Sequence, residues 1–181
     1  MSYKIPFSGR GHAYTQDEID CAVDAMQAPL SLTQGEFKTK FEHKFAEYSN
    51  SKYAFAVNNA TSALELAAQL CLFEKDDEVI IPSHTYTSSA YPFLKAGASI
   101  VWADIDLDTR VVNRKTVESC LTSKTKAIVV PHLYGYGADI EDIISLVAGK
   151  NIIVIEDAAQ SLGAFINGKM AGTFGDFGVY S

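Results

Sequence analysis

The chain has 181 residues, with 22 acidic and 15 basic side chains and a formal net charge of -7. This acidic balance, with a pI near 5.0, argues against a nucleic-acid partner, because proteins that bind nucleic acid usually carry a basic face. Apolar residues make up 48% of the sequence, which excludes an intrinsically disordered chain and is sufficient for a hydrophobic core.

Neither a membrane span nor an export signal is expected. The longest apolar runs, residues 127–131 and 152–155, are much shorter than the roughly 20 residues that a membrane-spanning helix needs. The first 12 residues contain no apolar signal-peptide segment. Cys21, Cys71 and Cys120 lie far apart and form neither a metal-binding spacing nor a disulfide framework. We therefore expect a cytoplasmic protein with no membrane partner.

Two helices are predicted before residue 50. Thr15 and Glu18 have the spacing of a capping box, and the apolar residues after them recur at helical intervals as far as Pro29, which ends the helix. A second box, formed by Thr33 and Glu36, is predicted to open another helix. That helix carries an aromatic stripe made of Phe37, Phe41, Phe45 and Tyr48. We expect the aromatic stripe to pack in the core.

After residue 52, short apolar runs alternate with helical stretches. The predicted strands are residues 53–57, 78–81, Ser99–Ala103, 126–130, 152–155 and 177–181, and the predicted helices are residues 62–73, 88–96 and 140–148. Nearly continuous apolar strands separated by helices indicate an α/β fold in three layers, with a mostly parallel sheet covered on both faces. Ligands of such sheets bind beyond the carboxyl ends of the strands.

One segment looks like a phosphate-binding P-loop but is better interpreted as a turn. Residues 163–169 match its first seven positions, yet Met170 stands where a serine or threonine should hold Mg²⁺. No helix is predicted after it, and Asn167-Gly168 is typical of a tight hairpin turn. The four histidines have no close ligand spacing, so no metal site is predicted.

The loops after two predicted strands carry candidate binding groups. Thr61 is a good N-cap for the helix at 62–73, where free N–H groups and the helix dipole favour an anion such as phosphate. Taken alone, this segment is more often an ordinary helix cap. Tyr86 follows the next strand and can stack on a flat heterocycle, although a partly buried tyrosine is the simpler interpretation in isolation.

Two successive acids, Glu156 and Asp157, follow the apolar strand at 152–155. A carboxylate at a buried strand end needs a partner, and a protonated pyridine nitrogen would be one; an N-cap is an equally good interpretation of Asp157. Gln160 follows within one helical turn, and the Ser181 hydroxyl can add a phosphate contact. In chain order these loops supply the groups that would hold pyridoxal 5′-phosphate (PLP).

Five segments resemble, in family order, the motifs of the DegT/DnrJ/EryC1/StrS sugar aminotransferases, which are fold-type-I PLP enzymes. These segments are residues 59–64, 77–83, 131–135, 156–160 and 175–181. The resemblance covers nearly all of the chain. It implies that residues 1–181 are the N-terminal part of the large PLP-binding domain, which would be incomplete here, with the C-terminal domain absent. It also implies a homodimer.

The resemblance assigns cofactor contacts to six residues. They are Thr61, Ser62, Tyr86, Asp157, Gln160 and Ser181. By resemblance, Thr61 and Ser62 bind the phosphate with Ser181 beside them, and Tyr86 stacks on the ring.

The remaining implied contacts concern the ring of the cofactor. Asp157 would pair with the pyridine nitrogen and keep it protonated, so that the ring can accept electrons from the substrate carbon. Gln160 would contact the ring from the same turn. The lysine that forms the Schiff base in this family is expected just beyond Ser181, so no catalytic residue is predicted within the chain.

Members of the family transfer an amino group, usually from glutamate, to a keto sugar carried on a nucleotide. The resemblance implies this reaction for the full-length protein, in the synthesis of polysaccharide or secondary-metabolite sugars. Two alternatives stay open. In the dehydratase branch of the family a histidine replaces the lysine, and the deciding residue lies after Ser181. Alternatively, the chain is a truncated, catalytically inert fragment without the lysine.

Overall fold

A five-stranded sheet forms the centre of the fold in the computed structural model, which describes residues 13–28, 33 and 35–181. The strands run in the order β2-β1-β3-β4-β7, and all the pairs are parallel. They are β1 (Glu78–Pro82), β2 (Ser99–Ala103), β3 (Thr125–Pro131), β4 (Ile153–Asp157) and β7 (Phe177–Val179). A separate antiparallel hairpin joins β5 (Phe165–Ile166) to β6 (Lys169–Met170).

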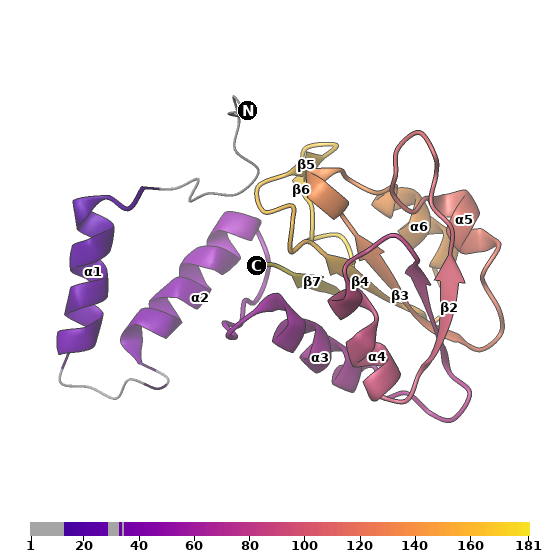
Figure 1. The fold of residues 1–181 in the computed structure, drawn as a ribbon, viewed down its shortest axis with the longest axis horizontal. Helices are drawn as coiled ribbons and strands as arrows, with labels where there is room; N and C mark the ends of the chain where they lie inside the picture. The colour runs from indigo at the N-terminus through magenta and orange to yellow at the C-terminus, as the bar shows by residue number, and fades with distance from the viewer. Residues whose placement is uncertain (1–12, 29–32, 34) are drawn as a thin grey trace, which may run out of the picture.

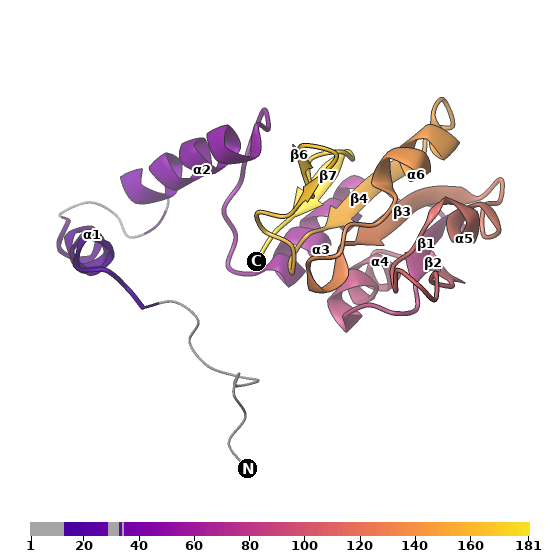
Figure 2. The same ribbon diagram turned by 90° about the horizontal axis from the view of Figure 1, so that it is seen from above.

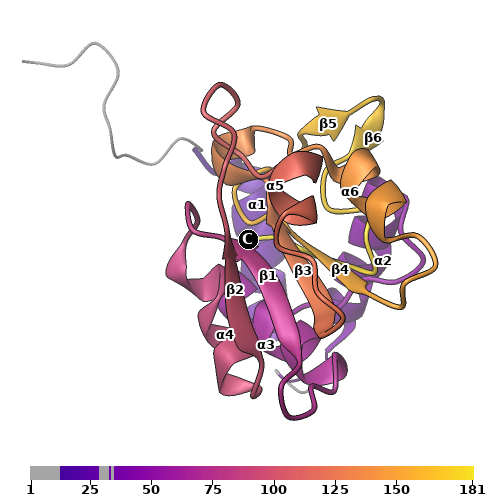
Figure 3. The ribbon, with the colours of Figure 1, turned by 90° about the vertical axis from the view of Figure 1, so that its right-hand side faces the viewer.

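Helices cover both faces of the sheet, with α3 and α4 on one face and α5 and α6 on the other (Figure 3). The helices are α1 (Gln16–Gln27), α2 (Glu36–Ser49), α3 (Ala60–Leu70), α4 (Tyr91–Lys95), α5 (Arg114–Glu118) and α6 (Ile140–Val147), with short 3₁₀ turns η1 (Thr87–Ser89) and η2 (Leu133–Gly135). None of the described helices is long and apolar enough to cross a membrane. The predicted three-layer α/β/α architecture is confirmed.

The core has two halves because successive strand residues point to opposite faces. Val79 and Ile81 belong to the cluster that packs under α3 and α4. Ile80, between them in sequence, belongs to the cluster under α5 and α6. Both faces of the strands are therefore buried, which explains why β1, β3 and β4 are nearly continuous apolar runs.

Most of the predicted elements are present, within one to three residues of their expected ends. The predicted helix at 88–96 is divided into η1 and α4, since Pro92 has no N–H group to continue a single helix. The hairpin turn at Asn167-Gly168 is confirmed, and both residues have the positive φ that a type I′ turn requires. Helix α5 was not predicted.

The strand predicted at residues 53–57 is wrong. This segment of the described chain forms no strand, and Phe55 keeps 80% of its surface exposed. Aromatic residues favour a strand only where a neighbouring strand and a core are available, and here the segment only connects α2 to α3.

The prediction that the aromatic stripe lies in the core of the chain is also wrong. Helices α1 and α2 extend to one side of the sheet (Figures 1 and 2), and α1 has no buried residue. Phe41 is 56% exposed, whereas Phe45 makes an edge contact with Tyr180 at a ring distance of 5.1 Å. Helical periodicity identifies the apolar face but not the surface that covers it.

The two predicted capping boxes have different outcomes. The Thr15–Glu18 box is confirmed, since the Thr15 hydroxyl accepts from the Glu18 N–H and the Glu18 carboxylate accepts from the Thr15 N–H. The second box is wrong, because Gly35 is the N-cap of α2 and gives no side-chain cap. Pro29, the predicted end of the first helix, lies outside the described residues.

We predict that Gly178→Ala destabilises the fold by at least about 3 kcal/mol, because a methyl group at this position of β7 would overlap the backbone carbonyl of Gly172. Gly149→Ala is the matched control, since Gly149 has a φ of +76° but open space around it and should cost only about 1–2 kcal/mol. Urea unfolding measures both. Equal losses of unfolding free energy in the two variants would contradict the close approach of β7 to the backbone at Gly172.

Candidate functional site

A cavity of about 260 Å³ lies at the carboxyl ends of the strands. Its walls come from the first turn of α3, the segment around η1 and the residues that follow β3 and β4. Five of the six predicted site residues line it: Thr61, Tyr86, Asp157, Gln160 and Ser181. Ser62 is not among the lining residues. The fold therefore brings together side chains that are up to 120 residues apart in sequence.

The start of α3 forms one end of the cavity. Asn59, and not the predicted Thr61, is the N-cap, because its side chain accepts a hydrogen bond of 2.9 Å from the Ser62 N–H. Helix geometry leaves the N–H groups of Ala60 and Thr61 without an intrahelical acceptor. With the helix dipole, these groups make the end of the cavity favourable to an anion. The Thr61 hydroxyl lies 2.8 Å from the Ser88 hydroxyl.

The predicted aromatic ring stands at the same cavity. Tyr86 is the N-cap residue of η1 and lines the cavity with 66% of its surface exposed. The simpler expectation of a partly buried tyrosine is therefore wrong. An exposed ring at a cavity wall is available to cover a flat ligand.

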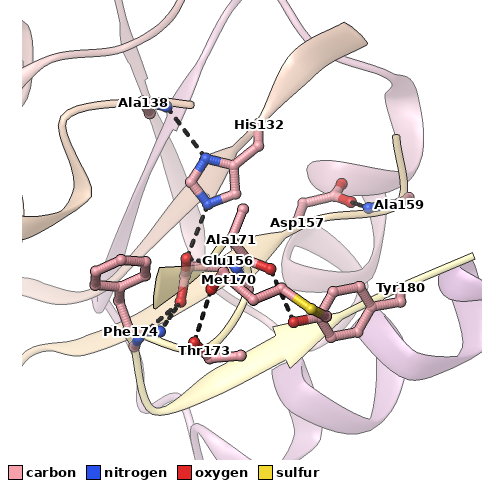
Figure 4. Close-up of polar contacts among 12 residues, drawn as sticks. His132, Ala138, Glu156, Asp157, Ala159, Met170, Ala171, Thr173, Phe174 and Tyr180 are labelled. Carbon is pink, nitrogen blue, oxygen red and sulfur yellow. Dashed lines mark hydrogen bonds and ion pairs between the residues drawn. The ribbon is translucent and has the colours of Figure 1, made fainter. Parts of the chain in front are cut away.

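The side chains of the two successive acids lie on opposite faces of β4. Glu156 is completely buried on the face opposite Asp157 (Figure 4). Its carboxylate accepts four hydrogen bonds: from the N–H groups of Phe174, Gly175 and Gly172 at 2.6, 2.7 and 2.8 Å, and from His132 at 2.8 Å. These donors replace the water that the carboxylate loses on burial. Glu156 thus anchors the loop that leads into β7.

His132 is held between two partners inside the protein. Its Nδ1 accepts a hydrogen bond from the Ala138 N–H at 3.1 Å, so this nitrogen carries no proton. Its Nε2 then carries the proton and donates it to Glu156. His132 lines the cavity, but in this arrangement neither ring nitrogen is available to a ligand.

Tyr180, which follows β7 directly, contacts the loop that Glu156 anchors. Burial, with the Glu156 charge close by, raises the pKa of the Tyr180 phenol well above its usual range. The phenol therefore stays protonated and donates to the Ala171 carbonyl oxygen at 2.8 Å.

Asp157 is the acid that faces the cavity. It is only 8% exposed, and no helix begins after it, so the N-cap interpretation is wrong. Its Oδ2 accepts from the Ser89 hydroxyl at 2.6 Å and its Oδ1 accepts from the Ala159 N–H at 3.2 Å. No basic side chain of the described residues forms an ion pair with Asp157. Its charge is left for a cationic group in the cavity.

Gln160 closes another part of the wall. It lies in a turn, and its side-chain oxygen accepts from the Tyr134 N–H at 2.9 Å. Tyr134 has a positive φ of 56°, an uncommon conformation that this hydrogen bond helps to stabilise. The side-chain NH₂ group of Gln160 remains available to a ligand.

Nothing in the sequence marks Ser89 as part of the site, because a small hydroxyl residue in an apolar segment has no pattern that distinguishes a buried hydrogen bond from a solvent contact. The interior hydrogen bond between Glu156 and His132 was not predicted either. The strand parity of residues 156 and 157 is the signal that separates the two acids.

The chain matches the model of the DegT/DnrJ/EryC1/StrS aminotransferase family over residues 13–181. It belongs to this family. It is 40% identical over 179 residues to the GDP-perosamine synthase of Escherichia coli O157:H7, an alignment that covers 99% of the chain and 47% of that relative. The chain spans about half the length of the curated relatives that it matches.

Solved structures of the family share the fold. The aminotransferase from Psychrobacter cryohalolentis aligns with a TM-score of 0.85 at 36% identity, covering 94% of this chain and 43% of that one. The E. coli GDP-4-keto-6-deoxy-D-mannose-3-dehydratase with bound hydrated PLP aligns with a TM-score of 0.86 at 29% identity, covering 97% and 46%. The expected fold class, that of a PLP-dependent aminotransferase domain, is confirmed.

We predict that Glu156→Gln lowers the free energy of unfolding by about 3 kcal/mol or more, because the new NH₂ group would face backbone N–H donors that lose their acceptor. Glu118→Gln, on the exposed surface of α5, should change it by less than about 0.5 kcal/mol. Urea denaturation followed by circular dichroism measures both. A loss at Glu156 no larger than the loss at Glu118 would contradict the anchoring role.

Proposed function

We propose that this chain is the cofactor-binding part of a PLP-dependent aminotransferase acting on a nucleotide-linked keto sugar. One observation carries the proposal: Asp157, a nearly buried carboxylate that pairs with no basic side chain of the described residues, shares a cavity with an exposed aromatic ring and the start of a helix. This combination suits a flat, phosphorylated heterocycle with a protonated nitrogen. Membership of the family supports the same ligand.

The residues of the cavity fit the parts of PLP one by one. The free N–H groups of Ala60 and Thr61 suit the phosphate, together with the hydroxyls of Thr61 and Ser181. Tyr86 suits a face of the ring. Asp157 suits the ring nitrogen, to which it offers an ionised oxygen. Ser62 has a smaller part than expected, because its N–H group is used by Asn59.

In this proposal the side chains of the cavity bind and orient PLP, and Asp157 also holds a proton in place. When bound, PLP supplies an electron sink for breaking bonds at the substrate carbon. Asp157 holds the proton on the ring nitrogen by accepting its hydrogen bond. Tyr86 covers the ring and excludes water, and the NH₂ group of Gln160 can donate to the ligand. The start of α3 fixes the phosphate end.

The same proposal covers the substrate, the amino donor, the position of the chain within the whole protein and its location in the cell. The named relatives support a keto sugar on a nucleoside diphosphate, and glutamate is the expected donor. We place the chain in the N-terminal part of the large domain, with the Schiff-base lysine following Ser181, and the protein in the cytoplasm.

A second candidate reaction is the removal of a hydroxyl group from the keto sugar. The similarity to the E. coli dehydratase, which has a TM-score of 0.86, favours it as the alternative. The two reactions use the same cofactor cavity and differ in their products: an amino sugar nucleotide in one case and a deoxy sugar nucleotide in the other.

The decisive experiment incubates the protein, as its gene encodes it, with PLP, glutamate and GDP-4-keto-6-deoxymannose. We expect an amino sugar nucleotide by mass spectrometry and 2-oxoglutarate in equal amount. Asp157→Asn should lower kcat at least about a hundredfold, because the ring nitrogen loses its anionic partner. Asp142→Asn, on the exposed side of α6, is the matched control and should stay within about twofold. A deoxygenated product would favour the dehydratase, and full activity of Asp157→Asn would refute the role of the acid.

We also propose that the protein is a homodimer in which the exposed apolar side of α1 and α2 contacts a second copy. Large apolar side chains on this side, including Met26, Phe41 and Tyr48, are between 56% and 70% exposed in the single chain. Phe41 and Tyr48 lie seven residues apart, and therefore on one face of α2. A large apolar patch that stays exposed is typical of an interaction site.

We predict that Phe41→Asp shifts the protein from dimer to monomer in analytical ultracentrifugation, because a charge would be buried at the contact. Thr39→Asp is the control, since it adds the same charge two residues away, on the opposite side of α2. A wild-type monomer, or equal effects of the two variants, would rule out this contact.

A further inference from the structure

We infer that Ser89 is a positioning residue that holds the Asp157 carboxylate in the orientation needed at the ring nitrogen, with Thr85 acting behind it. The inference rests on the proposed cofactor site and deepens it. Ser89 is completely buried and does not line the cavity, so it would act on the ligand only through Asp157.

The direction of the hydrogen bonds follows from counting protons. The Ser89 hydroxyl donates its single hydrogen to Asp157 Oδ2 at 2.6 Å. Its 2.8 Å contact with the Thr85 hydroxyl must then be one in which Thr85 donates and Ser89 accepts. The result is a relay from Thr85 to Ser89 to Asp157. Each donor strengthens the next, and the bond to the carboxylate is charge-assisted.

Asp157 depends on this relay for its orientation. Its only other hydrogen bond within the described residues is the one of 3.2 Å from the Ala159 N–H to Oδ1. A carboxylate rotates easily about its terminal torsion, so the short bond from Ser89 selects one rotamer. The remaining lone pairs are then presented in a fixed direction. Positioning of this kind matters because a small displacement of a charged group weakens its effect strongly.

The same short segment also contacts the other parts of the site. Tyr86 precedes η1, and the Ser88 hydroxyl lies 2.8 Å from the Thr61 hydroxyl at the start of α3. Residues 85–89 therefore connect the ring-covering side chain, the phosphate end and the acid. Ser89 lies 68 positions before Asp157 in the sequence, so only the fold makes this connection.

A structural role and a positioning role predict different binding data. If Ser89 only satisfied a buried hydrogen bond, its removal would weaken every ligand of the cavity alike. If Ser89 orients the Asp157 carboxylate, its removal would specifically weaken the binding of ligands that carry the ring nitrogen. The comparison needs 1-deaza-PLP, in which a carbon replaces that nitrogen.

The experiment measures the dissociation constants of PLP and 1-deaza-PLP for the apo form of the whole protein by equilibrium dialysis. We expect the wild type to prefer PLP and Ser89→Ala to lower that preference about tenfold. Thr85→Val, a milder change of similar volume, should lower it about threefold, since it removes the donor behind Ser89. Thr85 also lines the cavity, but a direct contact with the ligand would weaken PLP and 1-deaza-PLP alike and leave the preference unchanged. Ser145→Ala, on the exposed surface of α6, should leave it unchanged. In the Asp157→Asn background, Ser89→Ala should have no further effect.

Two results would overturn the inference alone. One is an unchanged preference in both Ser89→Ala and Thr85→Val; the other is an equal weakening of both ligands, while Asp157→Asn still abolishes the preference. A wild type that binds PLP no better than 1-deaza-PLP, with Asp157→Asn unchanged, would instead overturn the proposed cofactor site itself. If Ser89→Ala and Asp157→Asn lose the preference for PLP to a similar degree, the result supports both the positioning role of Ser89 and the proposed cofactor site.

Discussion

The site depends on one constraint: a carboxylate emerging from a buried parallel strand must receive hydrogen bonds or a counter-charge. Strand β4 presents two such groups in succession, and the pleat sends them to opposite faces. Glu156 receives four donors from the interior, which completes its requirements. Asp157 faces the cavity, and from residues 13–28, 33 and 35–181 it receives two donors and no basic partner. The same strand thus supplies both an anchor and a binding group.

The anchor and the cavity are coupled through the loop before β7. Glu156 binds three backbone N–H groups of this loop, while His132, on the cavity wall, donates to the same carboxylate. Gly178 allows the loop to approach β7 so closely that any side chain there would overlap its backbone. Because β7 leads to Ser181, the position of that hydroxyl depends on contacts made on the far side of the sheet.

How far the sequence predicted the fold depended on whether local pattern and tertiary packing agreed. The strands β1, β3 and β4 were predictable, since continuous apolar runs between helices require burial on both faces. Residues 53–57 and the aromatic stripe were misassigned, because apolar character indicates a need for cover without saying which surface provides it. Of the predicted site residues, all but Ser62 line one cavity, yet the cap of α3 lies at Asn59, two positions before the expected Thr61.

By itself, the sequence determined the α/β class, the order of the elements and the residue types at the strand ends, since these follow from periodicity and from the chemistry of side chains near each other in the chain. The resemblance had already assigned Asp157 to the ring nitrogen. Only the tertiary structure decided that a serine lies behind this acid and that His132 is held by interior partners. Those outcomes depend on hydrogen bonds between segments up to 68 residues apart, whose geometry exists only once the sheet and its helices have packed.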